Sequence, residues 1–377
     1  MAGIYLHIPF CQRRCLYCDF YSTTRLDLRQ RTVDALCREL EQRSDYLQGE
    51  AVTTLYLGGG TPSQLSVKQL GQLLECVAKV YGWGELEEVT MEANPDDLTE
   101  EYVRDLRTLP IGRISMGVQT FNDPTLRLLN RRHTAGQALE AIGRLRRVGF
   151  DNLSIDLIYG LPGETPERWE RDLAQAVALG VEHLSAYSLT YEEGTPLHRL
   201  LLQRQVTEVS EELSLHFYMR LIEVLEAAGY EQYEISNFCL PGRHSRHNAS
   251  YWADIPYLGC GPSAHSYDRS SRQWNVASLT RYLEASERGE RLFERESLSA
   301  DTRYNEFVMT RLRTRQGASL AQLEQLFGPE RRDYCLRLAA PFVEQGLLQL
   351  TADGRLCLTR RGLFTSDAVM SELMYIE

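Results

Sequence analysis

The chain has 377 residues, of which 43% are hydrophobic and 25% are charged, as in an ordinary globular protein. A chain of this length accommodates a large domain with a smaller one beside it. The formal net charge of −11 and the lack of a polybasic stretch argue against a broad nucleic-acid-binding surface, and no apolar run reaches the roughly 18 residues of a membrane span.

Short β-branched segments alternate with amphipathic segments through residues 1–230. The expected strands span 4–9, 53–59, 88–94, 113–119, 152–160 and 183–190. The expected helices lie near 28–47, 66–80, 99–108, 134–148, 165–179 and 209–228. In the second of these helices, Leu70, Leu73, Leu74 and Val77 recur at the spacing of one apolar helical face.

This alternation predicts an α/β fold, because successive strand–helix units build a parallel sheet with right-handed crossovers. Six units fall short of the eight that close a barrel, so we expect residues 1–230 to form a partial, splayed (β/α)6 barrel. An open, doubly wound sheet would produce much the same pattern, and periodicity does not separate the two.

The remaining residues suggest two further parts. Residues 231–296 hold many aromatic residues, Gly, Pro and His but few helical patterns, so we expect a loop-rich cover over the sheet. Residues 297–377 turn helical and then place two short apolar segments around Asp353-Gly354, as in a small winged-helix-like domain. Acidic and basic residues balance from 301 onward, which favours a structural or partner-docking role over nucleic acid.

Nine cysteines occur, and six of them are scattered singly. The N-terminal segment MAGIYLHIPF lacks the basic region of a signal peptide. This pattern is typical of reduced thiols, so we expect a cytoplasmic protein.

The other three cysteines, Cys11, Cys15 and Cys18, fall within eight residues of the stretch HIPFCQRRCLYCDFYS. A structural zinc site would need a fourth ligand, for which His7 is available. A redox dithiol would use Cys15 and Cys18 and leave Cys11 unexplained. An iron–sulfur cluster held by three thiolates would leave one iron open. The position just past the first strand favours the cluster, because chemistry in barrels occurs at that rim.

The Cys-x3-Cys-x2-Cys spacing after a first strand resembles the radical S-adenosylmethionine (SAM) superfamily. The resemblance implies a 4Fe–4S cluster on the three cysteines, with the methionyl group of SAM on the open iron. It also implies SAM contacts from Tyr5, from Tyr17 beside the adenine, and from Gly59, Gly60 and Thr61 beside the amino group.

Polar residues near the ends of later strands agree with such a site. Glu92, Gln119 and Asp156 follow this pattern in strands three to five, and Arg131 lies in the Asn130-Arg131-Arg132 stretch. Such side chains point into the mouth of a barrel, where ribose hydroxyls and a carboxylate need partners. Taken singly, each one is as readily explained by a helix cap or a surface ion pair.

Several blocks resemble the oxygen-independent coproporphyrinogen III oxidase (HemN) family: YLHIPFC, GGGTPS, MEANP, GVQTFND, LNRRH and DLIYGLPGETPERWERDL. A C-terminal domain of the HemN type accounts for 300–370.

Within this family the chain is most similar to the haem-chaperone branch. Phe20 stands where the oxidase carries a further cysteine, and the long N-terminal extension of the oxidase has no counterpart here. His247 to Trp252 match the H-N-x-x-Y-W motif, which that branch associates with haem binding.

The resemblance therefore implies a haem chaperone that passes haem to an acceptor protein of unknown identity. The alternative is an enzyme that oxidatively decarboxylates coproporphyrinogen III. Whether the chain catalyses a reaction is therefore left open, and so is whether it forms a homodimer. Imidazole is a good axial ligand of haem iron, and Tyr251 and Trp252 supply flat apolar surface. We expect His247 to be that ligand, with His244, His265 and Cys239 as rivals. A loop histidine hydrogen-bonded beside core aromatics is the competing interpretation.

Overall fold

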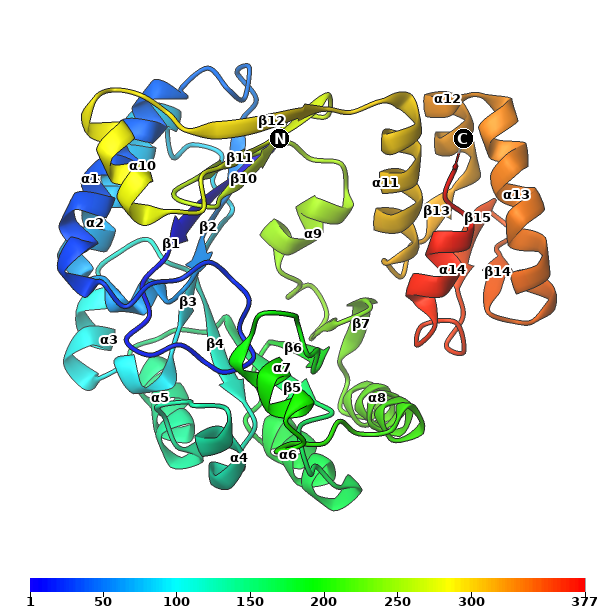
Figure 1. Cartoon of the computed structure of the whole chain (residues 1–377), viewed down its shortest axis with the longest axis horizontal. Coiled ribbons are helices and arrows are strands. Elements are labelled where there is room, and N and C mark those ends of the chain that lie inside the picture. Colours follow the sequence, from blue (N-terminus) through cyan, green and yellow to red (C-terminus); the bar gives the residue numbers. More distant parts are fainter. Residues whose placement is uncertain (377) are drawn as a thin grey trace.

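Six parallel strands form the centre of the fold in the computed structural model, which describes residues 1–376 (Figure 1). The strands are β1 (Ala2–Ile8), β2 (Val52–Gly59), β3 (Glu88–Ala93), β4 (Arg113–Gln119), β5 (Leu153–Tyr159) and β6 (His183–Ser188). The helices that follow them are α1 (Arg29–Gln42), α2 (Val67–Tyr81), α3 (Glu100–Leu106), α5 (Ala135–Arg147), α6 (Pro166–Ala178) and α8 (Glu211–Ala227). All six predicted strands and six predicted helices are confirmed, with ends shifted by a few residues.

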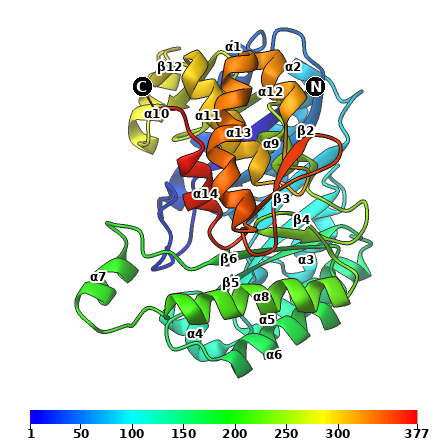
Figure 2. The same cartoon turned by 90° about the vertical axis from the view of Figure 1, so that its right-hand side faces the viewer.

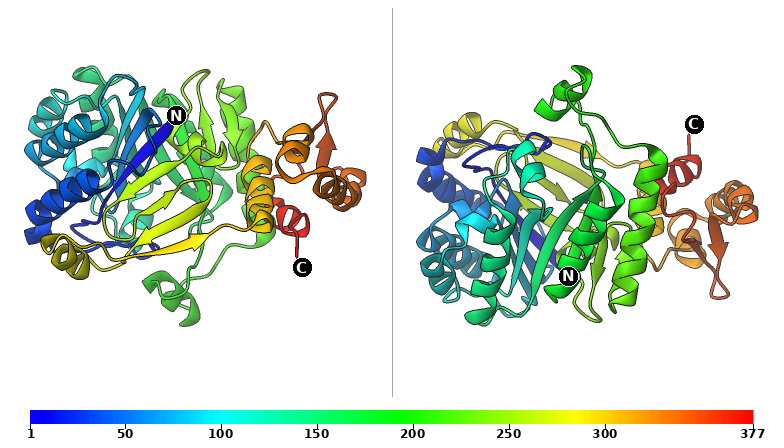
Figure 3. Two further views of the ribbon diagram at one scale, coloured as in Figure 1. Left: turned by 90° about the horizontal axis from the view of Figure 1, so that it is seen from above. Right: turned by 90° about the horizontal axis from the view of Figure 1, so that it is seen from below.

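The order of the strands separates the barrel from an open, doubly wound sheet. The six strands neighbour one another in consecutive order, β1 to β6, without the reversal of a doubly wound sheet. Right-handed crossovers in one direction place every helix on the same face, so the sheet curls around its other face. Figure 3 shows these helices as an outer layer beside the strands. The predicted partial barrel is confirmed.

Alternation along each strand sorts the side chains between the two faces. In β4, Ile114, Met116 and Val118 are buried in the core under the helices. Arg113 and Ser115 alternate with them and point into the barrel. A barrel interior is normally filled by Val, Ile and Leu, so this polar lining is the first structural sign of a ligand site.

The segment 231–296 extends this sheet at both edges, which corrects the expectation of a loop-rich cover. Strand β9 (Tyr257–Cys260) runs parallel to β1, and β10 (His265–Tyr267), β11 (Ser271–Asn275) and β12 (Phe293–Ser297) continue antiparallel. On the other side, β8 (Asn237–Cys239) pairs with β6, and β7 (Glu231–Glu234) pairs with β8. The helices are α9 (Arg246–Trp252) and α10 (Leu279–Glu287). Strands of three to five residues are too short to show a clear period, so the sequence pattern missed them.

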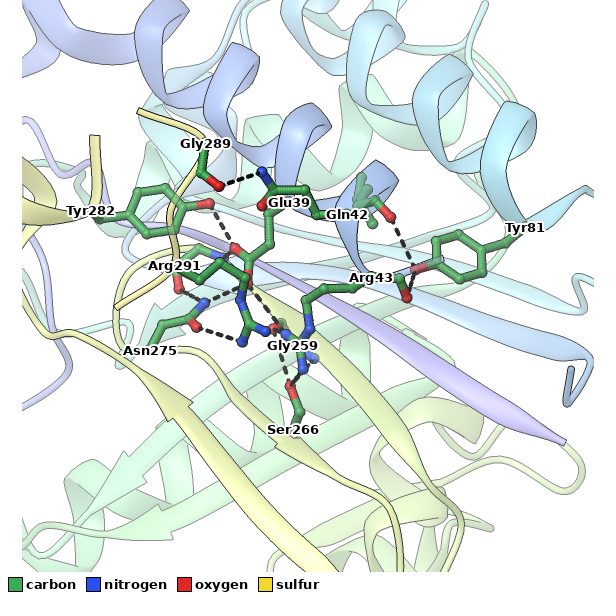
Figure 4. Close-up of polar contacts among 12 residues, drawn as sticks. Glu39, Gln42, Arg43, Tyr81, Gly259, Ser266, Asn275, Tyr282, Gly289 and Arg291 are labelled. Carbon is green, nitrogen blue, oxygen red and sulfur yellow. Dashed lines mark hydrogen bonds and ion pairs between the residues drawn. The ribbon is translucent and has the colours of Figure 1, made fainter. Parts of the chain in front are cut away.

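A buried polar cluster fastens the added strands to the barrel (Figure 4). Its centre is Glu39 on α1, which is 3% exposed. Glu39 accepts hydrogen bonds from Tyr282 Oη at 2.7 Å and from Asn275 Nδ2 at 2.8 Å. Arg43, one turn along α1, pairs with Glu39 at 3.3 Å and donates to Ser266 Oγ at 3.0 Å. These bonds join α1 to α10, β11 and β10.

The C-terminal residues form a smaller domain with its own hydrophobic core. Its elements are α11 (Ala300–Leu312), β13 (Ala318–Ser319), α12 (Leu320–Phe327), α13 (Pro329–Glu344), β14 (Leu348–Leu350), β15 (Arg355–Leu358) and α14 (Ser366–Glu372). Strands β14 and β15 pair across the predicted turn, where Gly354 has a φ of 75°, a conformation that favours glycine. No helix among residues 1–376 is long and apolar enough to cross a membrane.

Two short helices complete the barrel domain. Helix α4 (Asp123–Leu128) follows β4, and α7 (Pro196–Leu202) projects beside the body of the protein (Figure 2). Three single turns of 3-10 helix, Leu26–Leu28, Pro62–Gln64 and Pro95–Asp97, lie in the loops.

Candidate functional site

The cysteine loop lies at the carboxyl ends of the strands. It leaves β1 after Ile8 and is tied down by its own backbone, since Cys11 N donates to Thr23 O at 2.9 Å. Cys11 Sγ lies 3.5 Å from Thr61 Oγ1, just beyond the end of β2. Arg131 donates to Cys15 Sγ at 3.4 Å. Cys11 therefore lies beside the predicted glycine segment and Cys15 beside the predicted arginine, and Cys18 N donates to Cys15 O at 3.4 Å.

The three thiols are half-buried. Burial raises the pKa of Cys11 and raises the pKa of Cys18 to about 11. Neutral thiols are the stable form of these two groups unless a metal takes the place of the proton. Arg131 places a positive charge beside Cys15 Sγ.

The arrangement speaks against a zinc site. Both ring nitrogens of His7 have protein partners, Tyr5 Oη at 3.1 Å and Tyr21 O at 2.9 Å. Among residues 1–376, no three His, Cys, Asp or Glu side chains converge on one metal ion. Each thiolate of a 4Fe–4S cluster binds a different iron atom, so a cluster does not need the three sulfur atoms to converge on one point, as a single zinc ion does.

The glycines next to the cysteine loop are required by close packing. A Cβ at Gly59, where φ is 108°, would lie 2.6 Å from the His7 ring. A Cβ at Gly60 would lie 2.7 Å from the backbone carbon of Pro9. Larger residues would push β2 away from the start of the cysteine loop, so these glycines bring the rim together.

Glu92 connects the glycine segment to the barrel interior. Its carboxylate accepts from Gly59 N at 3.1 Å and from Tyr56 Oη at 2.8 Å. Burial raises the pKa of Glu92 to about 7, and the nearby charge of Asp156 acts in the same direction. This carboxyl group is therefore poised between its two protonation states near neutral pH.

Asn94 links the parts of the rim and was missed by the sequence analysis. It accepts from Arg131 Nη2 at 2.7 Å and donates to Thr61 Oγ1 at 3.3 Å. The chain of contacts thus runs from Cys11 through Thr61, Asn94 and Arg131 to Cys15. Asn94 belongs to the MEANP segment, but an asparagine before proline is also a common turn signal, so no pattern singled it out.

The other predicted SAM residues lie at different distances from the carboxyl ends of the strands. Gln119 ends β4 with a φ of 71°, and its amide lies over Gly117 beside Arg131. Asp156 occupies the middle of β5 and not its end, half-buried inside the barrel, where Ser115 Oγ donates to it at 3.4 Å. Burial raises the pKa of Asp156.

The two predicted tyrosines lie on different sides. Tyr5 stacks on Tyr56 inside the barrel, with ring centres 6.2 Å apart. Tyr17 packs against a small apolar cluster that includes Leu129 and Leu197. Leu197 belongs to α7, and its N–H donates to Leu16 O at 2.9 Å. Helix α7, which the sequence analysis did not predict, therefore holds the cysteine loop from outside.

His247 lies at the other end of the barrel, and on a helix, whereas the sequence pattern placed it in a loop. Glu88, the first residue of β3, accepts from the N–H groups of Arg246 at 2.9 Å and His247 at 3.0 Å. A Cβ at Gly3 would lie 3.1 Å from the His247 ring. Because Gly3 and Glu88 begin their strands while the cysteine loop follows strand ends, the barrel separates the two sites.

The His247 ring is fully buried. Its Nδ1 lies 2.8 Å from Thr54 Oγ1 and its Nε2 lies 2.9 Å from Tyr251 Oη. Its ring stacks on Tyr56 at 5.1 Å. Burial lowers the pKa of His247 to about 3, so the ring is neutral. In this structure both nitrogens are already hydrogen-bonded, as the competing interpretation expects.

The three alternative haem ligands lie elsewhere in the fold. His244 and His265 are exposed, and His265 stacks on Trp274 at 5.8 Å. Cys239 is buried in β8. None of the three lies on α9.

Comparisons with known proteins agree with this architecture. Residues 5–176 match the Radical SAM superfamily, and residues 298–365 match the HemN C-terminal domain. The chain is 38% identical over 380 residues to heme chaperone HemW of Mycobacterium tuberculosis, covering 99% of this chain and 94% of that protein. It is 31% identical over 380 residues to heme chaperone HemW of Bacillus subtilis, covering 99% of both.

A solved structure shows the same fold over nearly the whole chain. Coproporphyrinogen III oxidase (HemN) from Escherichia coli, a radical SAM enzyme, superposes with a TM-score of 0.85 and 25% sequence identity. The match covers 99% of this chain and 90% of that chain. The fold is therefore shared by proteins named for two different functions.

Proposed function

The chain belongs to the HemW family within the radical SAM superfamily, and on that basis we propose that it is a haem chaperone, which binds haem and transfers it to an acceptor protein. The observation that carries this proposal is the similarity to HemW proteins over 99% of the chain. That span includes the barrel, α9 and the C-terminal domain. The fold alone does not distinguish a haem chaperone from an oxidase, because a coproporphyrinogen III oxidase has the same fold.

The rim of the barrel is the proposed site of a 4Fe–4S cluster and SAM. Cys11, Cys15 and Cys18 would hold the cluster, and their half-buried position beside Arg131 fits thiolate ligands. The proposed SAM contacts are Tyr5, Tyr17, Gly59, Gly60, Thr61, Glu92, Gln119, Arg131 and Asp156. When bound, a cluster of this type with SAM supplies one-electron chemistry.

The residues of the rim have separate tasks in this proposal. Gly59 and Gly60 let the end of β2 pack against His7 and Pro9, which holds the rim in place beside the cysteine loop. Glu92 orients Gly59 N–H and can hold a proton at its carboxylate near neutral pH. Arg131 balances negative charge at Cys15 and is itself oriented by Asn94.

A haem ligand at His247, which the resemblance implies, would require a change of conformation. Its nitrogens would have to leave Thr54 and Tyr251 before either could bind iron. Its motif neighbours, Tyr251 and Trp252, are only half-buried and are open to a ligand without that change.

Coproporphyrinogen III oxidation is the second candidate function, favoured by the structural match to HemN. Phe20 argues against it, because the resemblance places a further cysteine of the oxidase at this position. Phe20 is 66% exposed in the cysteine loop, so it does not fill a core position that would explain it by packing.

Anaerobic reconstitution of the full chain with iron and sulfide, followed by haem titration and an oxidase assay, tests the proposal. We expect haem binding at one site and no conversion of coproporphyrinogen III to protoporphyrinogen in the presence of SAM. Conversion with consumption of SAM, or failure of the reconstituted protein to bind haem, would contradict the proposed function.

A pair of cysteine variants tests the separation of the two sites. Cys15→Ala should lose most of the iron yet still bind haem, because the barrel lies between the cysteine loop and α9. Cys37 lies on α1, remote from the rim, so Cys37→Ala should keep both the iron and the ability to bind haem. Full iron retention in Cys15→Ala would contradict the cluster assignment.

A further inference from the structure

A cavity opens between the barrel domain and the C-terminal domain, on the side of α9 that carries Tyr251 and Trp252. Figure 1 shows α9 between the strands of the barrel and α11. The cavity measures about 360 Å³, and α11 and α12 form its other wall, which includes Phe307 and Phe327. This size and its aromatic walls fall in the range of small-molecule sites.

From this cavity we propose that haem binds between α9 and α11, with Met309 as its axial ligand and Arg303 and Arg311 facing its propionates. The inference rests on the proposed function and deepens it, since it assigns the site and the groups that hold the cargo. In it, His247 is a positioning residue and not a ligand.

Apolar side chains in the cavity wall are left open to solvent. Met309 on α11 is 39% exposed and Leu326 on α12 is 42% exposed, although both adjoin the aromatic wall. Burying apolar surface of this kind stabilises a complex. A macrocycle placed here would cover side chains that the protein itself leaves uncovered.

Polar atoms in the wall also lack partners. Trp252 Nε1 and Arg311 Nε are buried and form no hydrogen bond among residues 1–376, although Arg311 Nη1 donates to Trp252 O across the cavity wall. Arg303 is exposed and forms no ion pair in the same part of the chain. Guanidinium groups pair well with carboxylates, and haem carries two of them on one edge. The third arginine of the wall, Arg272, is already paired with Glu306 at 2.9 Å.

The wall contains no imidazole and no thiol, which narrows the choice of axial ligand. A methionine thioether ligates haem iron in its neutral form, as in cytochromes. The phenol of Tyr267 already donates to Asp254, and the phenol of Tyr257 would have to lose its proton on binding iron. Met309 is therefore the side chain of the wall best suited to bind iron.

The role of His247 follows from its contacts. Its Nε2 lies 2.9 Å from Tyr251 Oη, and Tyr251 packs edge-on against Tyr257 at 4.8 Å. The buried ring thus fixes the tyrosine that forms the α9 side of the cavity. Loss of His247 would loosen this wall and weaken the binding of haem without removing a ligand of its iron.

Spectroscopy of the haem-loaded full-length protein tests the axial ligand. Met309→Leu keeps the volume of the side chain and should preserve the fold. We expect it to lose the thioether signature in magnetic circular dichroism and to bind haem about tenfold more weakly, equivalent to about 1.4 kcal/mol. His247→Gln should keep the thioether signature. A Met309→Leu protein with the wild-type spectrum and affinity would overturn the assignment of Met309, as would an imidazole signature that His247→Gln removes.

Titration with haem and with haem dimethyl ester, which lacks the free carboxylates, tests the arginines. Arg303→Gln and Arg311→Gln should each weaken binding of haem several-fold and leave binding of the ester unchanged. Arg315→Gln, in the same domain but outside the cavity, is the matched control and should change neither. Equal affinities of the wild type and both arginine variants for haem would overturn the site. Failure of the wild type to bind haem would instead overturn the proposed function.

Discussion

The charge of Glu92 is controlled by the interior of the barrel, where Tyr56, Asp156 and Arg113 face it from three neighbouring strands. Burial raises its pKa to about 7 from an ordinary value of 4.5, so the folded protein favours the protonated form. A carboxyl group of this kind stabilises the fold fully below its unfolded pKa, and the contribution is lost progressively as the pH rises from about 4.5 to about 7.

Glu92→Gln should therefore flatten part of the pH dependence of stability. The unfolding midpoint of the wild type should fall between pH 5 and pH 7 more steeply than that of the variant, when both are followed by thermal denaturation. Glu164 has a pKa raised to about 7 by burial and contributes a decline of the same sign, so Glu164→Gln should flatten the profile as well. Parallel pH profiles for the wild type and Glu92→Gln would show that Glu92 is ionised throughout this range.

Residue patterns were most informative where one residue type has one chemical use. Three close cysteines and a glycine run predicted a rim at which the structure does bring Cys11, Cys15 and Arg131 together. They did not predict Asn94, whose role depends on two partners distant in sequence. They also did not predict that His247 is buried, because the atoms around it come from β1, β2 and β3.

Helix α9 is only seven residues long and depends on its N-terminus for stability. Ser245 Oγ accepts from Asn248 N at 3.3 Å, and Glu88 accepts from two further N–H groups. These bonds satisfy donors that the first turn of any helix leaves free. Because Glu88 is buried, its bonds are shielded from water and worth more than those of an exposed cap.

Glu88→Ala should destabilise the protein by about 1–3 kcal/mol, since it leaves buried N–H groups without an acceptor. It should also weaken haem binding while iron content is retained after reconstitution. Glu87→Ala is the matched control, because its ion pair with Arg246 is half exposed and should contribute less than about 1 kcal/mol. Denaturant unfolding and haem titration measure both effects. Similar losses in the two variants would argue that α9 does not depend on its buried cap.

Elements of different length were predicted with different success. Helices of thirteen residues or more, such as α2 and α5, showed a complete apolar face in the sequence. The seven-residue helices α7 and α9 present at most two turns, which is too little for a period to stand out. Their positions are fixed by contacts with the cysteine loop and with β2 and β3, and such long-range contacts are not visible in a local pattern.

At the scale of the molecule, the cluster around Glu39 decides whether the added strands stay attached. Glu39→Ala would leave Arg43 as a buried charge without its carboxylate, which costs about 3–5 kcal/mol. We expect faster hydrogen exchange in β9 to β11 and a lower unfolding midpoint. Glu41→Ala, on the exposed side of the same helix, pairs only with Lys79 and should change neither. Unaltered exchange in β9 to β11 of Glu39→Ala would mean that strand pairing alone holds the extension.

The pairing of β1 with β9 sets an order of events during translation. Residues Gly3 to Leu6 are paired on one side with β2 and on the other with residues 257–260. A nascent chain therefore carries the cysteine loop beside an unpaired strand edge until more than 250 further residues have left the ribosome. Contacts this distant in sequence form late, and partly folded chains with open edges aggregate. Delivery of iron and sulfide to the cysteine loop before β9 is made would thus meet an incomplete sheet, so the scaffold favours cluster insertion after β9 has paired with β1.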